Sequence, residues 1–241
     1  MGPPPEPVEG TAPVELVDAP AAVLWDMDGT LVDTEPYWME VEQELVEEHG
    51  GVWTREHALQ VVGSELIVTA RYVREHGGVD LDPSEIVERL LDGVVARVRR
   101  SVPWRPGARE LLAELRDAGV PCALVTMSYE RFVAPVLEVL PKGSFDVVVT
   151  GDAVTRGKPH PEPYLHAARL LGVEPAECLA IEDSNTGARS AEAAGCLVLV
   201  VENHVAVEPG PRRVFLPTLE GLATADLADL AALADRTDRT S

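Results

Sequence analysis

Two acidic residues separated by one position, Asp26 and Asp28, directly follow the apolar run Ala21–Trp25. Carboxylates at the end of a buried strand repel each other, so the pair needs a nearby cation or hydrogen-bond donors. Gly29 would let the chain turn sharply after them. The spacing suits covalent chemistry on phosphorus, with Asp26 as the nucleophile and Asp28 as general acid and then general base. A turn in which an Asp caps the backbone is the structural alternative.

Polar side chains also follow two later apolar runs. Thr126, Met127 and Ser128 come after Cys122–Val125, where hydroxyls and backbone N–H groups form a natural cradle for an anion. Ser128 could equally be the N-cap of the next helix. Lys158 lies in a Gly-Lys-Pro sequence ahead of a helical pattern, where a fixed ammonium group could neutralise the nucleophile and a transferring phosphoryl group. Most lysines in such tripeptides are simply solvated.

A second pair of acids, Glu182 and Asp183, follows the run Cys178–Ile181. Adjacent carboxylates beside a helix N-terminus can hold a hard cation through oxygen ligands, and Mg²⁺ is the expected ion, with Mn²⁺ able to substitute. Asp183 is the better candidate for direct ligation, and Glu182 would bind directly or through water. An acid that caps the helix is the alternative reading.

The elements that must position these residues alternate between short apolar runs and helical patterns. The runs are continuous in apolar character, which is typical of strands buried on both faces of a parallel sheet. They are Ala21–Trp25, Cys122–Val125, Phe145–Thr150, Cys178–Ile181 and Cys196–Val201, and the helical patterns between them are Gly107–Ala118, Tyr129–Leu140, Pro161–Leu171 and Asn185–Ala194. We therefore expect an α/β fold with a doubly wound, Rossmann-like parallel sheet, whose strand ends bring the polar residues together.

One stretch interrupts this alternation with helical patterns alone. They cover Tyr37–His49, Arg55–Val62, Glu65–His76 and Pro83–Arg100. We expect an inserted all-helical cap at residues 36–103, with the α/β core formed by residues 20–35 and 104–236. Residues 1–19 are rich in proline and are expected to be disordered, and residues 237–241 are expected to be a loose tail.

The composition limits the partners. A formal net charge of −21 and a pI of about 4.5 repel phosphate backbones and anionic lipid, so we expect no nucleic-acid or membrane partner. No apolar run approaches the length of a membrane span and no secretory signal is seen, which predicts a cytoplasmic protein. The three cysteines, Cys122, Cys178 and Cys196, lie in apolar runs and are expected to be buried and reduced. A monomer is the default expectation.

Taken together, four segments resemble the motifs of the haloacid dehalogenase-like hydrolases: DxDGTLxDT, the Thr of VTMS, the Lys of GKP and EDSxxG. The helical insertion is similar to the small cap of the subgroup that includes phosphoglycolate phosphatase, β-phosphoglucomutase and 2-haloacid dehalogenase. The resemblance implies that Asp26 is the nucleophile, Asp28 the acid/base, Thr126 a phosphate ligand and Lys158 the stabilising cation. It also implies that Asp26, the Asp28 carbonyl and Asp183 hold Mg²⁺, with Glu182 near.

Departures from the family pattern narrow the activity. Asp28 argues against a dehalogenase, which lacks the second Asp. Trp38 replaces a His of the β-phosphoglucomutases, Tyr129 replaces a Lys, and the cap loop around Gly63 has no base. A mutase must grip a second phosphate, so hydrolysis of a small phosphorylated metabolite is expected, with a sugar phosphomutase as the alternative and a non-enzymatic binding protein as a weaker one. The backbone at Met27, Gly29, Met127 and Ser128 would contact phosphate, and Trp38 and Gly63 would line the cap side, although Trp38 could equally be packing.

Overall fold

A six-stranded, all-parallel sheet forms the centre of the protein in the computed structural model, which describes residues 20–61 and 66–230. The strand order is β3-β2-β1-β4-β5-β6. The strands are β1 (Ala22–Trp25), β2 (Cys122–Val125), β3 (Val147–Val149), β4 (Cys178–Glu182), β5 (Leu197–Val200) and β6 (Arg213–Phe215). The reversal of strand order beside β1 creates the switch point at which doubly wound sheets bind ligands.

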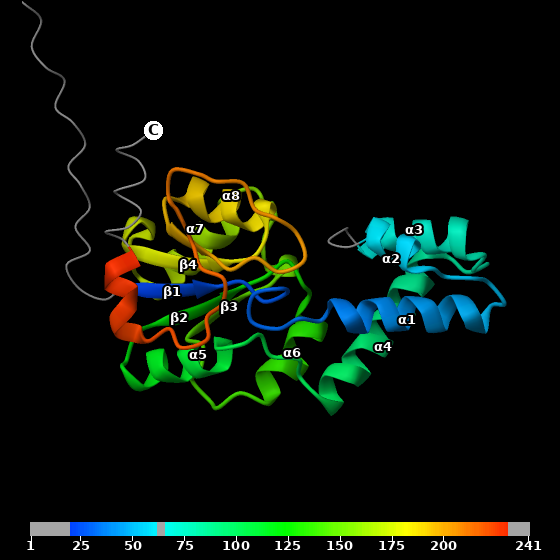
Figure 1. Ribbon diagram of the computed structural model, residues 1–241, viewed down its shortest axis with the longest axis horizontal. Coiled ribbons are helices and arrows are strands. Elements are labelled where there is room, and N and C mark those ends of the chain that lie inside the picture. The colour runs from blue at the N-terminus through cyan, green and yellow to red at the C-terminus, as the bar shows by residue number, and fades with distance from the viewer. Residues whose placement is uncertain (1–19, 62–65, 231–241) are drawn as a thin grey trace, which may run out of the picture.

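Helices cover both faces of the sheet (Figure 1), as the predicted fold class requires. They are α5 (Ala108–Asp117) and α6 (Glu130–Glu138) on one face, and α7 (Glu162–Leu171) and α8 (Asn185–Ala194) on the other. Single 3₁₀ turns occur at Gly151–Ala153, Pro175–Glu177 and Thr224–Asp226. Alternate residues of each strand serve the two faces: in β1, Val23 and Trp25 join the cluster with α5 and α6, whereas Ala22 and Leu24 join the cluster with α7 and α8.

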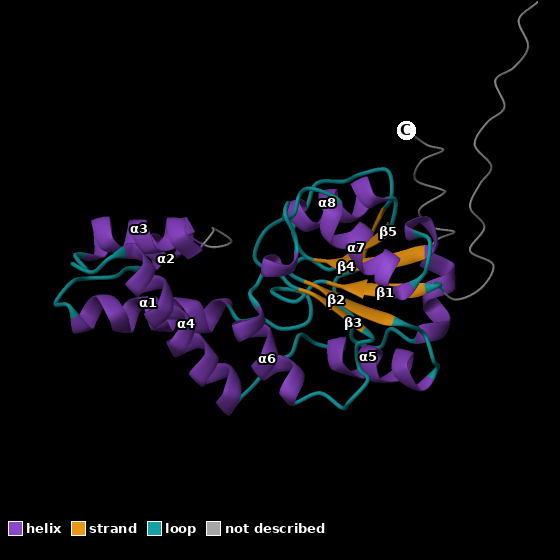
Figure 2. Ribbon diagram, turned by 180° about the vertical axis from the view of Figure 1, so that it is seen from behind, coloured by secondary structure: helices purple, strands orange, loops and turns teal. Residues whose placement is uncertain are grey.

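Four helices form a separate lobe, here called the cap: α1 (Glu35–Glu48), α2 (Arg55–Val61), α3 (Leu66–Gly77) and α4 (Pro83–Arg100). The cap lies beyond the carboxyl ends of the strands, with α1 and α4 nearest the core (Figure 2). The two segments that join it to the core pair with each other. The Asp33 N–H donates to the Pro103 carbonyl at 2.8 Å, and the Arg105 N–H donates to the Leu31 carbonyl at 3.0 Å.

Apolar periodicity predicted most of these elements to within a few residues. Strand β6, with three residues at the edge of the sheet, was not predicted. Its single core-facing apolar residue, Val214, is too little to mark a strand. Arg213 is buried with partners for its guanidinium, since it pairs with Glu192 and donates to the Glu208 carbonyl, both at 2.7 Å. The three cysteines are buried and unpaired, as expected. Within the described ranges, no helix combines the length and the apolar character needed to cross a membrane.

Candidate active site

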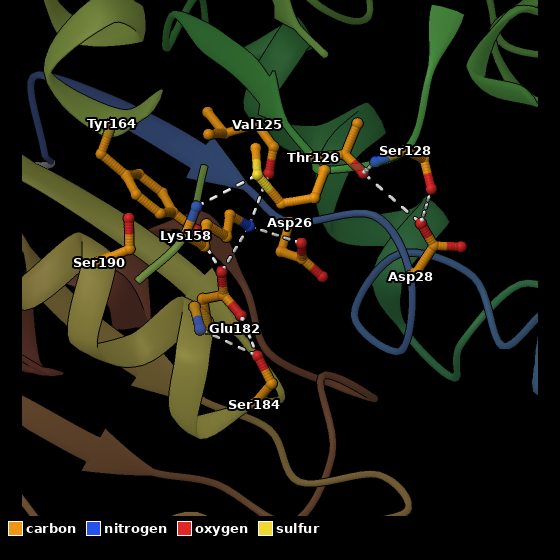
Figure 3. Close-up of polar contacts among 12 residues, drawn as sticks. Asp26, Asp28, Val125, Thr126, Ser128, Lys158, Tyr164, Glu182, Ser184 and Ser190 are labelled. Atoms are coloured by element: carbon orange, nitrogen blue, oxygen red, sulfur yellow. Dashed lines mark hydrogen bonds and ion pairs between the residues drawn. The ribbon is translucent and has the colours of Figure 1, made fainter. Parts of the chain in front are cut away.

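The register of the sheet brings the predicted residues to one edge. Trp25 of β1 pairs with Leu124 of β2 and with Ile181 of β4, so the three strands end at the same level. Asp26 and Thr126, which follow β1 and β2, therefore lie side by side (Figure 3). Asp183, which follows β4, offers an oxygen within 4.8 Å of one on Asp26. Residues more than 150 positions apart in sequence thus share one site because parallel strands align their carboxyl ends.

Lys158 lies at the centre of this site. Its Nζ donates to Asp26 Oδ1 at 2.7 Å, to the Val125 carbonyl at 2.8 Å and to Glu182 Oε1 at 2.7 Å. All three ammonium donors are thereby used. Burial alone would lower the pKa of Lys158, but the charges of Asp26 and Glu182 outweigh that effect and raise the pKa above its usual value. The lysine stays charged and holds the Asp26 carboxylate in one orientation.

The second oxygen of Asp26 is free. Asp26 Oδ2 is buried and has no hydrogen-bond partner among the described residues, whereas Oδ1 is held by Lys158. An unsatisfied buried carboxylate oxygen is costly, and such an atom calls for an electrophile or a cation. The geometry therefore leaves Asp26 Oδ2 available to react, while Oδ1, which accepts one hydrogen bond from Lys158, keeps a second lone pair for a metal.

Asp28 is held differently, by hydroxyl groups. Thr34 donates to its Oδ1 at 2.9 Å, and Ser128 donates to its Oδ2 at 2.6 Å, with Thr126 at 3.5 Å from the same oxygen. Burial raises the pKa of Asp28 to about 6, and the charge of Asp26 adds to the rise against the lowering effect of the Ser128 hydrogen bond. A carboxyl group with a pKa near neutrality can both give and take a proton.

The Thr126 loop supports this arrangement. The Ser128 N–H donates to Thr126 Oγ1 at 3.0 Å, and α6 is preceded at its N-cap position by Tyr129. Ser128 therefore contacts Asp28 and does not cap the helix. Met127 accepts the Lys158 N–H on its sulfur at 3.2 Å, and a Cβ at Gly157 would lie 2.6 Å from that sulfur. A side chain at position 157 would therefore require the Met127 side chain to shift.

Glu182 is one of the three groups that accept a hydrogen bond from the Lys158 ammonium group. Its side chain is fully buried, and it accepts hydrogen bonds from Lys158, Tyr164 and Ser184. Ser184, not an acid, is the N-cap of α8 and accepts the Gly187 N–H. Tyr164 could not be predicted as a site residue, because a Tyr at an apolar position of a helix looks in sequence like an ordinary core residue. Its ring centroid lies 5.0 Å from Lys158 Nζ and its hydroxyl fixes Glu182.

Three carboxylates form a candidate metal centre: Asp26, Glu182 and Asp183 each offer an oxygen within 4.8 Å of the others. Asp183 lies against the turn after Asp28, because a Cβ at Gly29 would fall 1.9 Å from Asp183 Oδ2. Burial raises the pKa of Asp183 to about 9, and the charges of Asp26 and Glu182 add to the rise. So crowded a set of hard oxygen donors, with Asp26 Oδ2 unpaired, fits a divalent cation such as Mg²⁺.

The remaining predicted residues lie in three different places. The Met27 side chain is fully buried in the core, so only its backbone can face the site. Trp38 on α1 is partly buried with its ring edge on Phe132, at 5.7 Å between centroids, which is the packing role considered above. Gly63 lies outside the described residues.

The sequence of the chain, compared with known proteins, matches the haloacid dehalogenase-like hydrolase family over residues 20–195. The chain belongs to the haloacid dehalogenase-like hydrolases. The expected family is thus confirmed. The expected fold, an α/β sheet with a helical cap, is confirmed as well. The cap's residue boundaries and the roles of individual site residues stay predictions.

Relatives of this hydrolase carry phosphatase names. Hexitol phosphatase B of Escherichia coli (strain K12) is 32% identical over 186 residues, which cover 75% of this chain and 82% of that protein. N-acetylmuramic acid 6-phosphate phosphatase of Pseudomonas aeruginosa is 36% identical over 182 residues, covering 72% and 78%. The crystal structure of CbbY from Rhodobacter sphaeroides in complex with phosphate superposes with a TM-score of 0.72 at 28% identity, covering 84% and 96%. These relatives support the assignment of the enzyme as a phosphatase.

Proposed function

We propose that this hydrolase is a Mg²⁺-dependent phosphatase that acts on a small phosphorylated metabolite through an aspartyl-phosphate intermediate on Asp26. The observation that carries the proposal is the asymmetry of the Asp26 carboxylate. Oδ1 is fixed by Lys158, while the buried Oδ2 has no partner in the described part of the chain. A carboxylate held at one oxygen and free at the other is prepared for attack along one direction.

In the first half-reaction, Asp26 Oδ2 attacks phosphorus and the bond between phosphorus and the ester oxygen breaks. The leaving alkoxide takes a proton from Asp28, which burial keeps partly protonated near pH 6. Thr34 and Ser128 hold the Asp28 carboxyl in place through hydrogen bonds to its two oxygens. The products of this step are the free alcohol and an acyl phosphate on Asp26.

In the second half-reaction, Asp28 removes a proton from a water molecule as the water attacks phosphorus. The bond between phosphorus and Asp26 Oδ2 breaks, inorganic phosphate leaves, and Asp28 is again protonated. Lys158 remains on Asp26 Oδ1 throughout, because Glu182 and the Val125 carbonyl hold the ammonium group. Tyr164 fixes Glu182 in turn, so the cation keeps its position while charge on the phosphoryl group changes.

Asp26, Asp183 and the Asp28 carbonyl would hold the Mg²⁺ ion, and Glu182 is the weaker candidate because its oxygens already accept three hydrogen bonds. When bound, the ion would act as a Lewis acid that neutralises the phosphoryl oxygens and the acidic cluster. A net charge of −21 opposes the approach of an anionic substrate, so that neutralisation would favour substrate entry.

A sugar phosphate or a related small phosphomonoester is the proposed substrate class. Support comes from relatives whose names specify hexitol and N-acetylmuramic acid 6-phosphate substrates. The cytoplasmic location and the monomeric state predicted from sequence stay predictions.

The test is phosphate release from a panel of sugar phosphates, nucleotides, phosphoglycolate and an aryl phosphate, with Mg²⁺ or with EDTA. We expect metal-dependent release that disappears in Asp26→Asn, which is nearly isosteric and keeps the core packing. Equal turnover by folded Asp26→Asn would exclude Asp26 as the nucleophile. Isomerisation of a hexose phosphate without phosphate release would favour the phosphomutase alternative.

A further inference from the structure

The segment Ser128–Phe132, which leads into the first turn of α6, contacts both the active site and the cap. Ser128, just before the helix, donates to Asp28 Oδ2 at 2.6 Å. Arg131 forms ion pairs with Glu88 and Asp92 of the cap helix α4. Phe132 packs edge-on against Trp38 of the cap helix α1. The same short segment therefore carries the hydroxyl that holds the acid/base and the side chains on which the cap rests.

Arg131 is the charged part of this contact. Glu88 and Asp92 are four residues apart on α4, so they lie on one face of that helix, one turn from each other. The Arg131 guanidinium, with its planar set of N–H donors, bridges the two carboxylates from the core side. Helices α4 and α6 are in direct contact, so this bridge lies in the interface between cap and core.

The chain enters and leaves the cap through two loop segments that pair with each other. The Asp33 N–H donates to the Pro103 carbonyl, and the Arg105 N–H donates to the Leu31 carbonyl. Loop segments at the ends of a lobe are the usual place for a hinge, so this pairing fixes where the cap is attached and leaves its angle to the sheet to other contacts. Contacts away from the hinge must set that angle.

We infer that Arg131, Glu88 and Asp92 form a cap–core clasp that fixes the angle of the cap over the active site. Arg131 is a positioning residue in this role, since it touches the cap and not the reacting atoms. The three side chains are each about half or more exposed to solvent. Salt therefore weakens the clasp, because the Debye length falls to about 3 Å at 1 M ionic strength.

The cap provides a matched control. Arg97 on α4 pairs with Glu40 at 3.0 Å and with Glu44 at 2.5 Å, both on α1. This is again one arginine between two carboxylates spaced four residues apart, but all three lie within the cap. Arg97→Gln removes the same chemistry as Arg131→Gln without touching the interface between cap and core.

The angle of the cap can be measured with a pair of spin labels, without any assay of activity. Leu59 on α2 and Leu165 on α7 are exposed and lie in cap and core respectively, so Leu59→Cys and Leu165→Cys provide the attachment points. The native cysteines will not compete, because burial raises the pKa of Cys122, Cys178 and Cys196 to about 12. Pulsed electron–electron double resonance then gives the distance distribution between the two spin labels.

We expect a narrow distribution in the otherwise wild-type protein at low salt, and a broader, shifted one in Arg131→Gln and in the wild type at 1 M salt. Arg97→Gln should keep the narrow distribution. The charge swap Arg131→Glu with Glu88→Arg and Asp92→Arg should restore it. An unchanged distribution in Arg131→Gln, or an equal change in Arg97→Gln, would overturn the inference.

A kinetic readout extends the test and rests on the proposed function. Because the clasp acts on the cap and not on the reacting groups, Arg131→Gln should raise KM several-fold for the substrate that the panel identifies, while kcat changes little. Arg97→Gln should leave both constants as they are. If the panel shows no turnover, the proposed function fails, yet the spin-label distances still decide on the clasp.

Discussion

The ion pairs of Lys158 in the core and those of Arg97 in the cap lie in opposite surroundings. In the core, the Lys158 side chain is 5% exposed and its partner Glu182 is fully buried. In the cap, Arg97 is 12% exposed, but Glu40 and Glu44 are 60% and 62% exposed. A desolvated charge depends on its fixed partners, whereas a solvated carboxylate can return to water when its partner is lost. The Lys158 pairs are thus fixed by their burial, whereas the Arg97 pairs can break at a small cost.

The largest effect should follow from breaking the buried network in the core. Lys158→Ala leaves Asp26 and Glu182 without their cation, and removing one partner of a buried pair costs about 3–5 kcal/mol. We expect a loss of that size in the free energy of unfolding at pH 8, measured with urea in EDTA, together with loss of phosphatase activity. Burial raises the pKa of Glu182, so the deficit should shrink as the pH falls and a protonated Glu182 no longer needs the cation. A loss below 1 kcal/mol in the free energy of unfolding at pH 8 would contradict the view that the buried charges depend on Lys158.

The next effect concerns a buried acid in the cap, Glu42, and tests whether a buried charge without a cationic partner is as costly there as in the core. Burial raises the pKa of Glu42 from 4.5 to about 8, with a hydrogen bond from Trp53 opposing the rise and the charge of Glu35 adding to it. The folded protein therefore binds a proton that the unfolded chain releases, so stability falls as the pH rises from 4.5 to about 8. Each pKa unit corresponds to about 1.4 kcal/mol, and Glu42→Gln should add roughly 2–4 kcal/mol at pH 9.

The same substitution should have no effect at pH 4, where Glu42 is protonated in both states. The exposed Glu56 on α2 offers the matched control, since Glu56→Gln should change stability little at either pH. Thermal unfolding of the two variants across this pH range gives the comparison. Equal stabilisation by Glu42→Gln at pH 4 and at pH 9 would show that its cause is not ionisation.

A smaller effect concerns the pKa of Asp28. The Ser128 hydrogen bond lowers the pKa of Asp28, so Ser128→Ala should raise it further above about 6. The first half-reaction needs protonated Asp28, so the alkaline limb of the kcat/KM profile should move to higher pH. A hydrogen bond contributes about 0.5–1.5 kcal/mol, which sets the move at roughly 0.4–1 pH unit. A shift of that limb toward lower pH would argue against Asp28 as the acid.

The smallest effect is expected within the solvated pairs of the cap. Glu44→Gln removes one of the two carboxylates on Arg97, and pairs of this exposure contribute about 0.2–1 kcal/mol. Urea unfolding in low salt and in 1 M salt should show a small loss in the first condition and almost none in the second. A loss as large as that of Lys158→Ala would remove the distinction between the two regions.

Much of the site could be predicted from sequence because its residues directly follow strands. Asp26, Thr126 and Asp183 each come just after a continuous apolar run, and the rule that parallel strands bind ligands at their carboxyl ends brings them together. The side-chain partners could not be predicted in this way. Tyr164 and Thr34 hold the site through hydrogen bonds to Glu182 and Asp28, but each looks in sequence like core or turn.

The sequence by itself determined the order of elements, the helical character of the insertion and the residue types at each strand end, since these depend on local periodicity and composition. Only the tertiary structure decided which oxygen of Asp26 is free and that Glu182 accepts a hydrogen bond from Lys158. It also decided that Arg131 of the core pairs with Glu88 and Asp92 of the cap. The reason is that these relations join segments distant in sequence, and their directions are fixed by packing of the sheet and of α6, which leaves no local pattern in the chain.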